Sequence, residues 1–210
     1  SMLTDMHCEL LVLGRYGKGG LKQGKLGSIA NKLVRQSPVS TLVVPPEFRG
    51  EFTRIGVATD LTEAAGLGVE RALQLGAMLG HEEIVLMHAF TIPVGYHQFC
   101  TREDAVEKIH AVSHERAETL LSRVRERVPN APKVKIVLEE GSAGSHIPAM
   151  AQREGVDLLV LNTHTRSKSA LLLLGRTTEH ILAESTCAVW AEKSPQVYHG
   201  FLHALKELLR

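Results

Sequence analysis

The stretch Glu9-Leu-Leu-Val-Leu-Gly14 returns later in the chain as Asp157-Leu-Leu-Val-Leu-Asn162. Each contains a short, continuously apolar run, which is typical of a parallel strand buried on both faces. The two stretches lie 157 − 9 = 148 residues apart, and the same spacing continues without a gap as far as Val43 and Ala191. A repeat of this length indicates duplicated domains rather than the short units of a solenoid.

The two copies differ in how much sequence precedes them. Before Asp157, the chain from Thr53 onward alternates between strand and helix patterns, whereas only eight residues precede Glu9. The first copy is therefore interpreted as the end of a domain, which stops at Pro45-Pro46 because consecutive prolines cannot continue a central strand. The predicted parts are a first-domain fragment (strand, glycine loop, helix, last strand) at 1–50, a complete domain at 51–193 and a C-terminal amphipathic helix at 194–210.

Strand and helix patterns alternate throughout the complete copy. A helix is expected to begin at Ser145, which leaves Pro148 in its first turn, where proline is tolerated. The alternation predicts an α/β fold with a doubly wound parallel sheet and right-handed crossovers. Such sheets bind ligands at the carboxyl ends of their strands. The predicted strands are 54–59, 83–90, 134–138, 158–161 and 187–191, and the other clear helices are 103–128 and 176–184.

Composition and charge argue against several other classes of protein. The chain has 24 basic and 23 acidic residues, so its net charge of +1 gives no field that would recruit nucleic acid or an anionic membrane. No apolar run approaches the roughly 20 residues needed to cross a bilayer, and no signal peptide is recognised. Cys8, Cys100 and Cys187 are too scattered for a disulfide framework. We expect a cytoplasmic protein with free thiols that binds neither nucleic acid nor membranes.

A glycine motif follows the first apolar run. Gly14 and Gly17 are followed, after nine residues, by Gly27 and Ser28 at the start of a predicted helix. Glycine lets the backbone approach a ligand closely, and a helix N-terminus offers free N–H groups and a positive dipole end to phosphate. The basic side chains between residues 15 and 35 are expected to form a solvated face that would also suit phosphates. They are Arg15, Lys18, Lys22, Lys25, Lys32 and Arg35.

This motif resembles that of the universal stress protein family, whose ATP-binding members carry Gly-x2-Gly-x9-Gly-Ser/Thr at this place. The resemblance also includes Val57-Ala-Thr-Asp60, Leu86-Met-His88-Ala89 and Glu154-Gly-Val-Asp157, and it covers residues 8–193. It implies a five-stranded sheet in the order 3-2-1-4-5, of the adenine-nucleotide alpha-hydrolase-like fold, accompanied by a partial second copy.

The resemblance also implies a ligand and a mode of association. ATP is the expected ligand: Asp60 and the main chain of Ala89 would face adenine, and the glycine loop would hold the ribose and phosphates. Family domains or subunits associate through their last strands. We therefore expect a homodimer formed through the terminal strands and the C-terminal helix.

The complete copy departs from the family motif. A side chain at Thr165 restricts the backbone and fills space that a phosphate would approach. Arg176 either attracts an anion through its guanidinium or fills the site. The motif is therefore intact only in the first-domain fragment, which lacks the strands that would contact adenine. The first copy has Gly14, Gly17, Gly27 and Ser28 where the complete copy has Asn162, Thr165, Gly175 and Arg176.

No catalytic or metal site is predicted. Substrate-activating loops of related nucleotide folds, such as Ser-Gly-Gly-x-Asp-Ser, do not occur, and no recognisable motif places an acid–base pair. His88 is expected to be a hydrogen-bonded core histidine. We expect a regulatory module without turnover; the alternatives are a slow ATPase or autophosphorylating protein, and a structural dimer that binds no nucleotide. A zinc site is not predicted, because no second Cys-x2-Cys pair supports one. The residues considered for it are His97, Cys100, His110 and His114.

Overall fold

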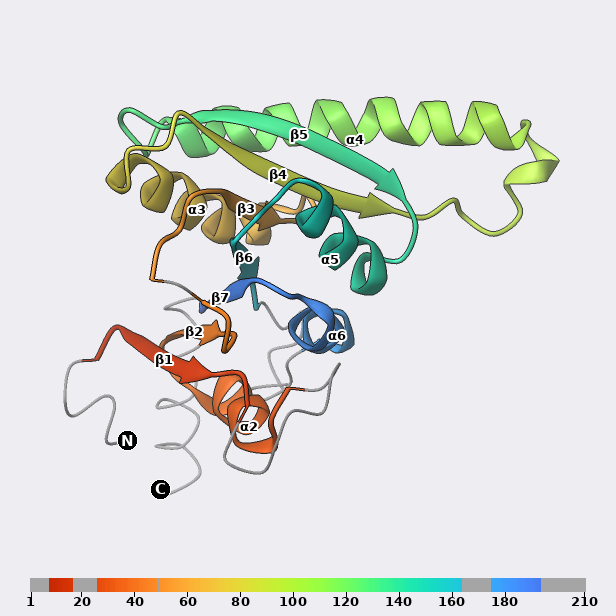
Figure 1. Cartoon of the computed structure of the whole chain (residues 1–210). Helices are drawn as coiled ribbons and strands as arrows, with labels where there is room; N and C mark the ends of the chain where they lie inside the picture. The colour runs from red at the N-terminus through yellow and green to blue at the C-terminus, as the bar shows by residue number, and fades with distance from the viewer. Residues whose placement is uncertain (1–7, 17–25, 49, 164–174, 194–210) are drawn as a thin grey trace, which may run out of the picture.

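The computed structural model describes residues 8–16, 26–48, 50–163 and 175–193, which form one sheet with helices on both faces (Figure 1). The bounds predicted for the second strand and the last helix of the complete copy are confirmed. The predicted C-terminal helix at 194–210 lies outside the described residues. None of the described helices is long and apolar enough to span a bilayer. The elements are β1 (Leu10–Gly14), α2 (Ser28–Gln36), β2 (Ser40–Val44), β3 (Ile55–Ala58), η1 (Glu63–Ala65), α3 (Gly66–Met78), β4 (Glu83–Phe90), η2 (Tyr96–Gln98), α4 (Arg102–Arg125), β5 (Lys133–Glu140), α5 (Ala143–Arg153), β6 (Leu158–Asn162), α6 (Arg176–Glu184) and β7 (Ala188–Glu192).

The sheet has seven strands rather than the predicted five, in the order β1-β2-β7-β6-β3-β4-β5. The strands of the complete copy run β5-β4-β3-β6-β7 and are parallel. β1 and β2 are parallel to each other, but β2 pairs antiparallel with β7. The five strands expected for the complete copy therefore continue, across the paired last strands β2 and β7, into the two strands of the first copy. An unpartnered last strand would leave a row of backbone N–H and C=O groups unpaired, and here β2 and β7 satisfy each other.

The sequence repeat is also a structural repeat. Every bound of the β1–α2–β2 unit is matched 148 residues later in the β6–α6–β7 unit, as in 158 − 10 = 148 and 192 − 44 = 148. Pairing across the seam between β2 and β7 follows the same symmetry, because Leu42 faces its own counterpart, Trp190. A local twofold axis therefore passes between Leu42 and Trp190, and the two units meet along it.

Helices cover both faces of the sheet, each above its own apolar core (Figure 1). α3 and α4 cover one face, where Val69 is fully buried. α2, α5 and α6 cover the other, where Met150 is fully buried. Successive strand side chains point to opposite faces, so in β4 Leu86 enters the first core and Met87 the second. This burial on both faces explains the continuously apolar strands.

Helix α5 begins earlier than predicted. Ser142, not Ser145, precedes its first turn, and Pro148 lies inside the helix. An internal proline removes one helical N–H and pushes its ring against the carbonyl four residues earlier, at about 3 kcal/mol. Ile147 and Met150, which flank the proline, are buried in the core, and each contributes roughly 1.5–3 kcal/mol by burial. Tertiary packing thus outweighs the local cost of the proline.

Candidate functional site

Three of the predicted site residues meet at one end of neighbouring strands. Asp60 follows β3, Ala89 lies near the end of β4, and Asn162 ends β6. The strand registers place the end of β3 beside both the last residues of β4 and those of β6. The direction of chain progression across the sheet reverses at β3 and β6, which is where open α/β sheets bind ligands. The complete copy therefore has a candidate site at this edge.

Asp60 is exposed and is held by the turn that follows β3. Its Oδ1 accepts hydrogen bonds from the backbone N–H of Thr62 at 3.1 Å and from the Thr62 hydroxyl at 2.5 Å. On the neighbouring strand, His88 Nδ1 lies 2.9 Å from the carbonyl oxygen of Thr59. The hydrogen bond expected for this histidine is confirmed, but the residue is half-buried and not in the core. The Asp60 carboxylate is thus presented at the surface in a fixed orientation.

Asn162 bridges the space between β6 and the turn after β3. Its Nδ2 donates a hydrogen bond to the carbonyl oxygen of Ala64, in η1. The start of α3 is equally close, since a Cβ added at Gly68 would lie 3.2 Å from the Cβ of Asn162. The counterpart of Asn162 in the first copy is Gly14. The complete copy therefore places a hydrogen-bonded side chain where the family motif has a glycine.

Gly175 and Arg176 begin α6 at the same edge of the sheet. Its N-cap residue is Gly175, which has no side chain to accept a hydrogen bond from the first N–H groups of the helix. Arg176 is exposed. Glu179 lies in the first turn and pairs with Arg35 of α2, with 2.5 Å between Nη1 and Oε1. The start of α6 thus carries both a positive and a negative side chain.

The first copy presents the same backbone with different side chains. Gly27 precedes α2 with φ −55° and ψ 143°, against −61° and 147° for Gly175 before α6. Ser28 is exposed, and the first turn of α2 has neither a capping side chain nor an acidic residue. A Cβ added at Gly14 would meet no atom closer than the Tyr16 carbonyl oxygen, at 3.7 Å. The first turn of α2 therefore has an exposed serine and no acidic side chain of its own.

Gly17 and Thr165, the second position of the motif in each copy, lie outside the described residues. The remaining motif residues of the two copies occupy opposite ends of the sheet. Strand direction reverses at the β2–β7 seam, so the carboxyl end of β1 lies at the amino ends of β6, β3 and β4. Gly14, Gly27 and Ser28 therefore do not converge with Asp60 and Ala89 on a single ligand.

Arg15 connects the two copies, a role that the sequence analysis missed. It was expected on a solvated face, but it is buried, and its guanidinium donates to the carbonyl oxygens of Ser185 and, at 3.1 Å, Cys187. Its counterpart Thr163 stays within its own copy, where its hydroxyl donates to the carbonyl oxygen of Glu192 at 2.7 Å. The available signal was the repeat itself, which sets an arginine against a threonine directly after the same strand.

A buried polar cluster lies across the seam between β2 and β7. Glu192 is 6% exposed. Its Oε2 accepts hydrogen bonds from Trp190 Nε1 at 2.6 Å, Ser40 Oγ at 3.1 Å and Arg71 Nε at 3.1 Å. The Arg71 guanidinium also lies over the Trp190 ring, 5.6 Å from its centroid. The buried carboxylate is thus paired and hydrogen-bonded, as a charge away from water requires, and it joins β2, β7 and α3.

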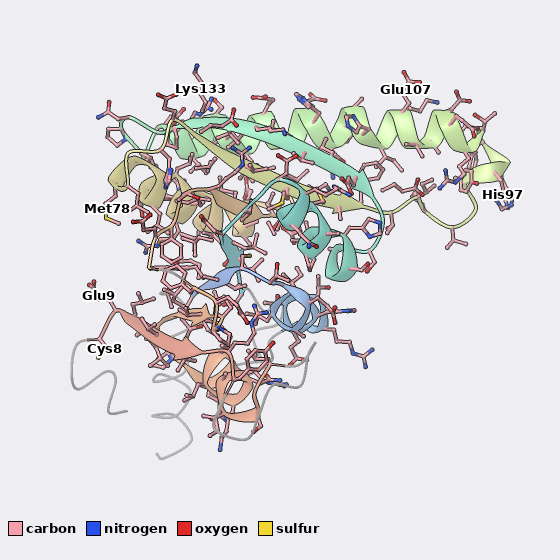
Figure 2. The ribbon with its side chains drawn as sticks, in the orientation of Figure 1. Cys8, Glu9, Met78, His97, Glu107 and Lys133 are labelled. Carbon is pink, nitrogen blue, oxygen red and sulfur yellow. The ribbon has the colours of Figure 1, made fainter. Side chains whose placement is uncertain are left out.

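A cavity of about 360 Å³ opens between the turn after β3 and α4. Of the predicted site residues that the structure describes, Asp60 lines it. Glu63 and Arg123 pair at its wall at 2.8 Å. Elsewhere in the described part of the chain, no group of three or more His, Cys, Asp or Glu side chains is arranged to hold a metal ion. Figure 2 shows His97 at the tip of the β4–α4 connection, pointing outward.

Comparison with known sequences points to one family. The sequence model of the Universal stress protein family matches residues 2–45 and 51–192. Curated universal stress proteins of Mycobacterium tuberculosis and Mycobacterium bovis are 25% identical over 189 residues, which cover 83% of this chain. The chain spans 58% of the length of these relatives.

Solved structures share the fold. A crystal structure from Pseudomonas aeruginosa UCBPP-PA14, provisionally described as a universal stress protein, has a TM-score of 0.71 at 19% identity, over 97% of this chain and 70% of that one. A universal stress protein of Lactobacillus plantarum has a TM-score of 0.55 at 18% identity, over 69% of this chain and 100% of its own. At these identities the likeness shows the fold alone.

Proposed function

The chain belongs to the universal stress protein family, and we propose that it acts as a stress-response regulatory module that binds ATP without turning it over. In this proposal the phosphates bind at the glycine motif of residues 14–28, and the degenerate motif of residues 162–176 serves as scaffold. The ligand, the absence of turnover and the division of roles all go beyond family membership.

One observation carries the proposal: the difference between Gly14 and Asn162 on otherwise matching backbones. Phosphate binding at a strand–loop–helix junction needs backbone N–H groups that a ligand can approach closely. In the complete copy that approach meets the Asn162 side chain, which is bonded to Ala64. At Gly14 there is no side chain, and among the described residues an added Cβ would meet first the Tyr16 carbonyl oxygen, at 3.7 Å.

Charge at the two helix starts favours the same assignment. The positive end of a helix dipole attracts an anion, and an acidic side chain in the first turn opposes it. α2 has no acidic residue in its first turn, whereas α6 carries Glu179. The counterpart of Glu179 in α2 is the neutral Asn31. A phosphate near Ser28 therefore meets no first-turn carboxylate.

The contacts of Arg15 support a regulatory role. Arg15 directly follows Gly14, and its guanidinium reaches the carbonyl oxygens of Ser185 and Cys187 in the other copy. A ligand that orders the backbone at Gly14 would therefore act on the connection between α6 and β7. Such coupling requires only that nucleotide binds differently to two arrangements of this contact.

Exchanging motif residues between the copies tests the proposal. Isothermal titration of the 210-residue protein with ATP and Mg²⁺ is compared for wild type, Gly14→Asn/Ser28→Arg, and the reciprocal Asn162→Gly/Arg176→Ser. The first variant should lose at least tenfold in affinity, about 1.4 kcal/mol. Its fold should survive, because a Cβ at Gly14 is accommodated and Ser28 is exposed. The reciprocal variant should keep the original site.

Each part of the proposal has its own contrary result. Absence of ATP binding by the wild type would reject the ligand. Loss of affinity in the reciprocal variant, with none in Gly14→Asn/Ser28→Arg, would reverse the roles of the two copies. Phosphate release that is linear in time and abolished by Gly17→Val would show turnover and reject the non-catalytic assignment.

A further inference from the structure

Strand β5 forms one outer edge of the sheet, and its charged residues are sorted by sign along its length. Lys133 and Lys135 lie in its first half, and Glu139 and Glu140 lie at its end. Figure 2 shows Lys133 at the start of this strand, on the far side of the sheet from β1. β5 lies inside the continuous described range 50–163, so α4 and α5, its neighbours in sequence, are both described. Among the described strands it pairs only with β4.

The backbone of β5 has hydrogen-bonding groups that point away from β4. At its start, the Lys133 N–H donates to the Glu82 carbonyl oxygen at 2.9 Å. Just beyond its end, the Gly141 N–H donates to the Phe90 carbonyl oxygen at 2.7 Å. Successive residues of a strand direct their N–H and C=O groups to opposite sides, so the odd-numbered residues bond to β4 and the even-numbered ones point outward. The even-numbered residues are Val134, Ile136, Leu138 and Glu140.

Two charged residues of β5 pair with the end of α5, on one face of the sheet. Lys135 Nζ lies 2.7 Å from Glu154 Oε2, and Arg153 pairs with Glu139. Lys135 and Glu139 are both odd-numbered, so their side chains point to the same face. The Lys135 and Arg153 side chains are 46% and 57% exposed, so a further charge can lie beside either ion pair.

We propose that two copies of this chain associate through β5, with the two strands antiparallel and a twofold axis at Val137. In this arrangement Lys135 of one copy faces Glu139 of the other, on both sides of the axis. A symmetric contact requires a surface that complements itself, and opposite charges that face each other across antiparallel strands stabilise the pairing. The charges then alternate in sign along each row, in the order Glu154, Lys135, the partner's Glu139 and the partner's Arg153.

Backbone geometry and charge select this register. Outward-pointing residues must oppose each other in an antiparallel pair, so even-numbered residues face even-numbered ones and the axis passes through a residue. With the axis at Val137, Ile136 faces the partner's Leu138 as a hydrogen-bonded pair. An axis at Ile136 would instead set Lys135 against Val137, and an axis at Leu138 would set it against Gly141. Of these three, the axis at Val137 joins the two ion pairs.

A second copy is the occupant that this edge fits. Charged side chains keep an edge strand from pairing indiscriminately, and a second copy running in the opposite direction has the complementary order of charges. The last strands of the two units, β2 and β7, already pair with each other within the chain, so we place the expected homodimer at β5. With eight residues in the strand, the contact is small, and we expect association in the micromolar range.

Sedimentation velocity of the 210-residue protein between about 1 and 100 µM tests the proposal. The wild type should shift toward twice its chain mass of 23.0 kDa as concentration rises. Glu139→Lys should raise the dissociation constant of the dimer about tenfold or more, because position 139 then repels Lys135. The matched control Glu184→Lys makes the same charge change at an exposed site on α6 and should dimerise as the wild type does. Equal dimerisation of the two variants, or a wild type that stays monomeric throughout, would overturn the proposal.

Mixing two variants separates charge repulsion from misfolding. Lys135→Glu should also weaken its own dimer, because position 135 then repels Glu139. An equimolar mixture of Glu139→Lys and Lys135→Glu should form a heterodimer, because both facing pairs again join opposite charges. Exposed ion pairs contribute little to folding, so each variant should still melt cooperatively by circular dichroism. A mixture that stays as dissociated as its components would contradict the proposal.

Cysteine cross-linking tests the position of the axis. In a Cys8→Ser/Cys100→Ser background, Val137→Cys should form a covalent dimer on mild oxidation, because facing residues of antiparallel strands lie within disulfide range. The matched control Val134→Cys should not, because position 134 faces position 140 of the partner and its two copies lie roughly 20 Å apart. Equally fast cross-linking at positions 134 and 137 would reject the proposed surface.

Discussion

The same strand–helix–strand unit occurs twice in this molecule, in two different settings. In the complete copy β6 is paired on both sides and Val160 is fully buried; in the first copy β1 is an outer strand and Val12 is exposed. The element bounds nevertheless agree throughout. Apolar patterning and turn positions therefore specify the unit itself, while its neighbours decide how much each residue contributes to stability.

The chemical differences between the units gather around the strand–helix loop. Gly14 of the first unit corresponds to Asn162 of the second, and Ser28 corresponds to Arg176. Among the described residues, Gly14 leaves the end of β1 without a side chain, whereas Asn162 places a hydrogen-bonded side chain at the end of β6. The two units thus share a framework and differ in the side chains beside the strand–helix connection, which is the difference that the proposed function uses.

The largest expected effect on stability comes from an aspartate substitution at Val160, which is compared with the same substitution at its counterpart Val12. Val160→Asp buries an unpaired carboxylate and should cost several kcal/mol, a large share of the 5–15 kcal/mol that stabilises a typical domain. Val12→Asp should leave a cooperative melting transition, because its side chain reaches water. Circular dichroism melting measures both. Equal loss of stability in the two variants would mean that Val12 is as buried as Val160.

Next in size is the loss of the connection between the copies. Arg15→Ala leaves the buried carbonyl oxygens of Ser185 and Cys187 without their donor, and should cost about 1.5–3 kcal/mol. Arg15→Lys should not restore the stability, because an ammonium lacks the planar fork that reaches two acceptors. The matched change Thr163→Ala should cost about 0.5–1.5 kcal/mol. Urea denaturation measures all three, and a larger loss for Thr163→Ala would contradict the bridging role.

A smaller effect is expected for the ion pair between α2 and α6. The side chains of Arg35 and Glu179 are 33% and 31% exposed, so water and salt screen their attraction. Glu179→Gln should cost less than about 1 kcal/mol at low ionic strength, and the cost should shrink as salt is added. Denaturation at two salt concentrations checks this. A cost that is large and independent of salt would indicate packing rather than charge.

Near neutral pH the smallest effect comes from the Cys187 thiol, because its contribution to stability changes only when the pH becomes alkaline. Burial raises the pKa of the Cys187 thiol from 9.0 to about 11. Between these values the unfolded chain releases a proton that the folded chain keeps, so stability falls as pH rises. Cys187→Val, which introduces the residue found at the counterpart Val39, should remove this part of the slope. Denaturation between pH 9 and 11 measures it, and unchanged slopes would contradict a buried, protonated thiol.

Features set by local pattern were predictable from sequence. The 148-residue repeat, the bounds of β4 and α6 and the meeting of Asp60, Ala89 and Asn162 at one sheet edge all follow from apolar patterning and α/β topology. The β2–β7 seam did not follow from local pattern, because no local signal tells which strand a free edge will pair with. The family resemblance did imply it, since domains of the family associate through their last strands, and the pairing of β2 with β7 confirms this expectation.

Contacts between distant parts of the chain were equally hidden. Arg15 was predicted to lie on a solvated face, because the two carbonyl groups that it contacts are 170 and 172 residues further along the chain. The bond from Asn162 to Ala64 depends on where η1 packs against the end of β6. The predicted start of α5, which placed Pro148 in the first turn, was wrong for a related reason. Packing of α5 against the core outweighs the local helix signals.

Hydrogen–deuterium exchange with and without ATP tests most directly whether the two units have diverged in ligand binding. The helices α2 (Ser28–Gln36) and α6 (Arg176–Glu184) have the same length and backbone geometry at their starts, so each serves as the other's control. ATP should slow exchange at the start of α2 and leave α6 nearly unchanged. Protection that appears at α6 and not at α2 would contradict the assignment of the nucleotide to the first unit.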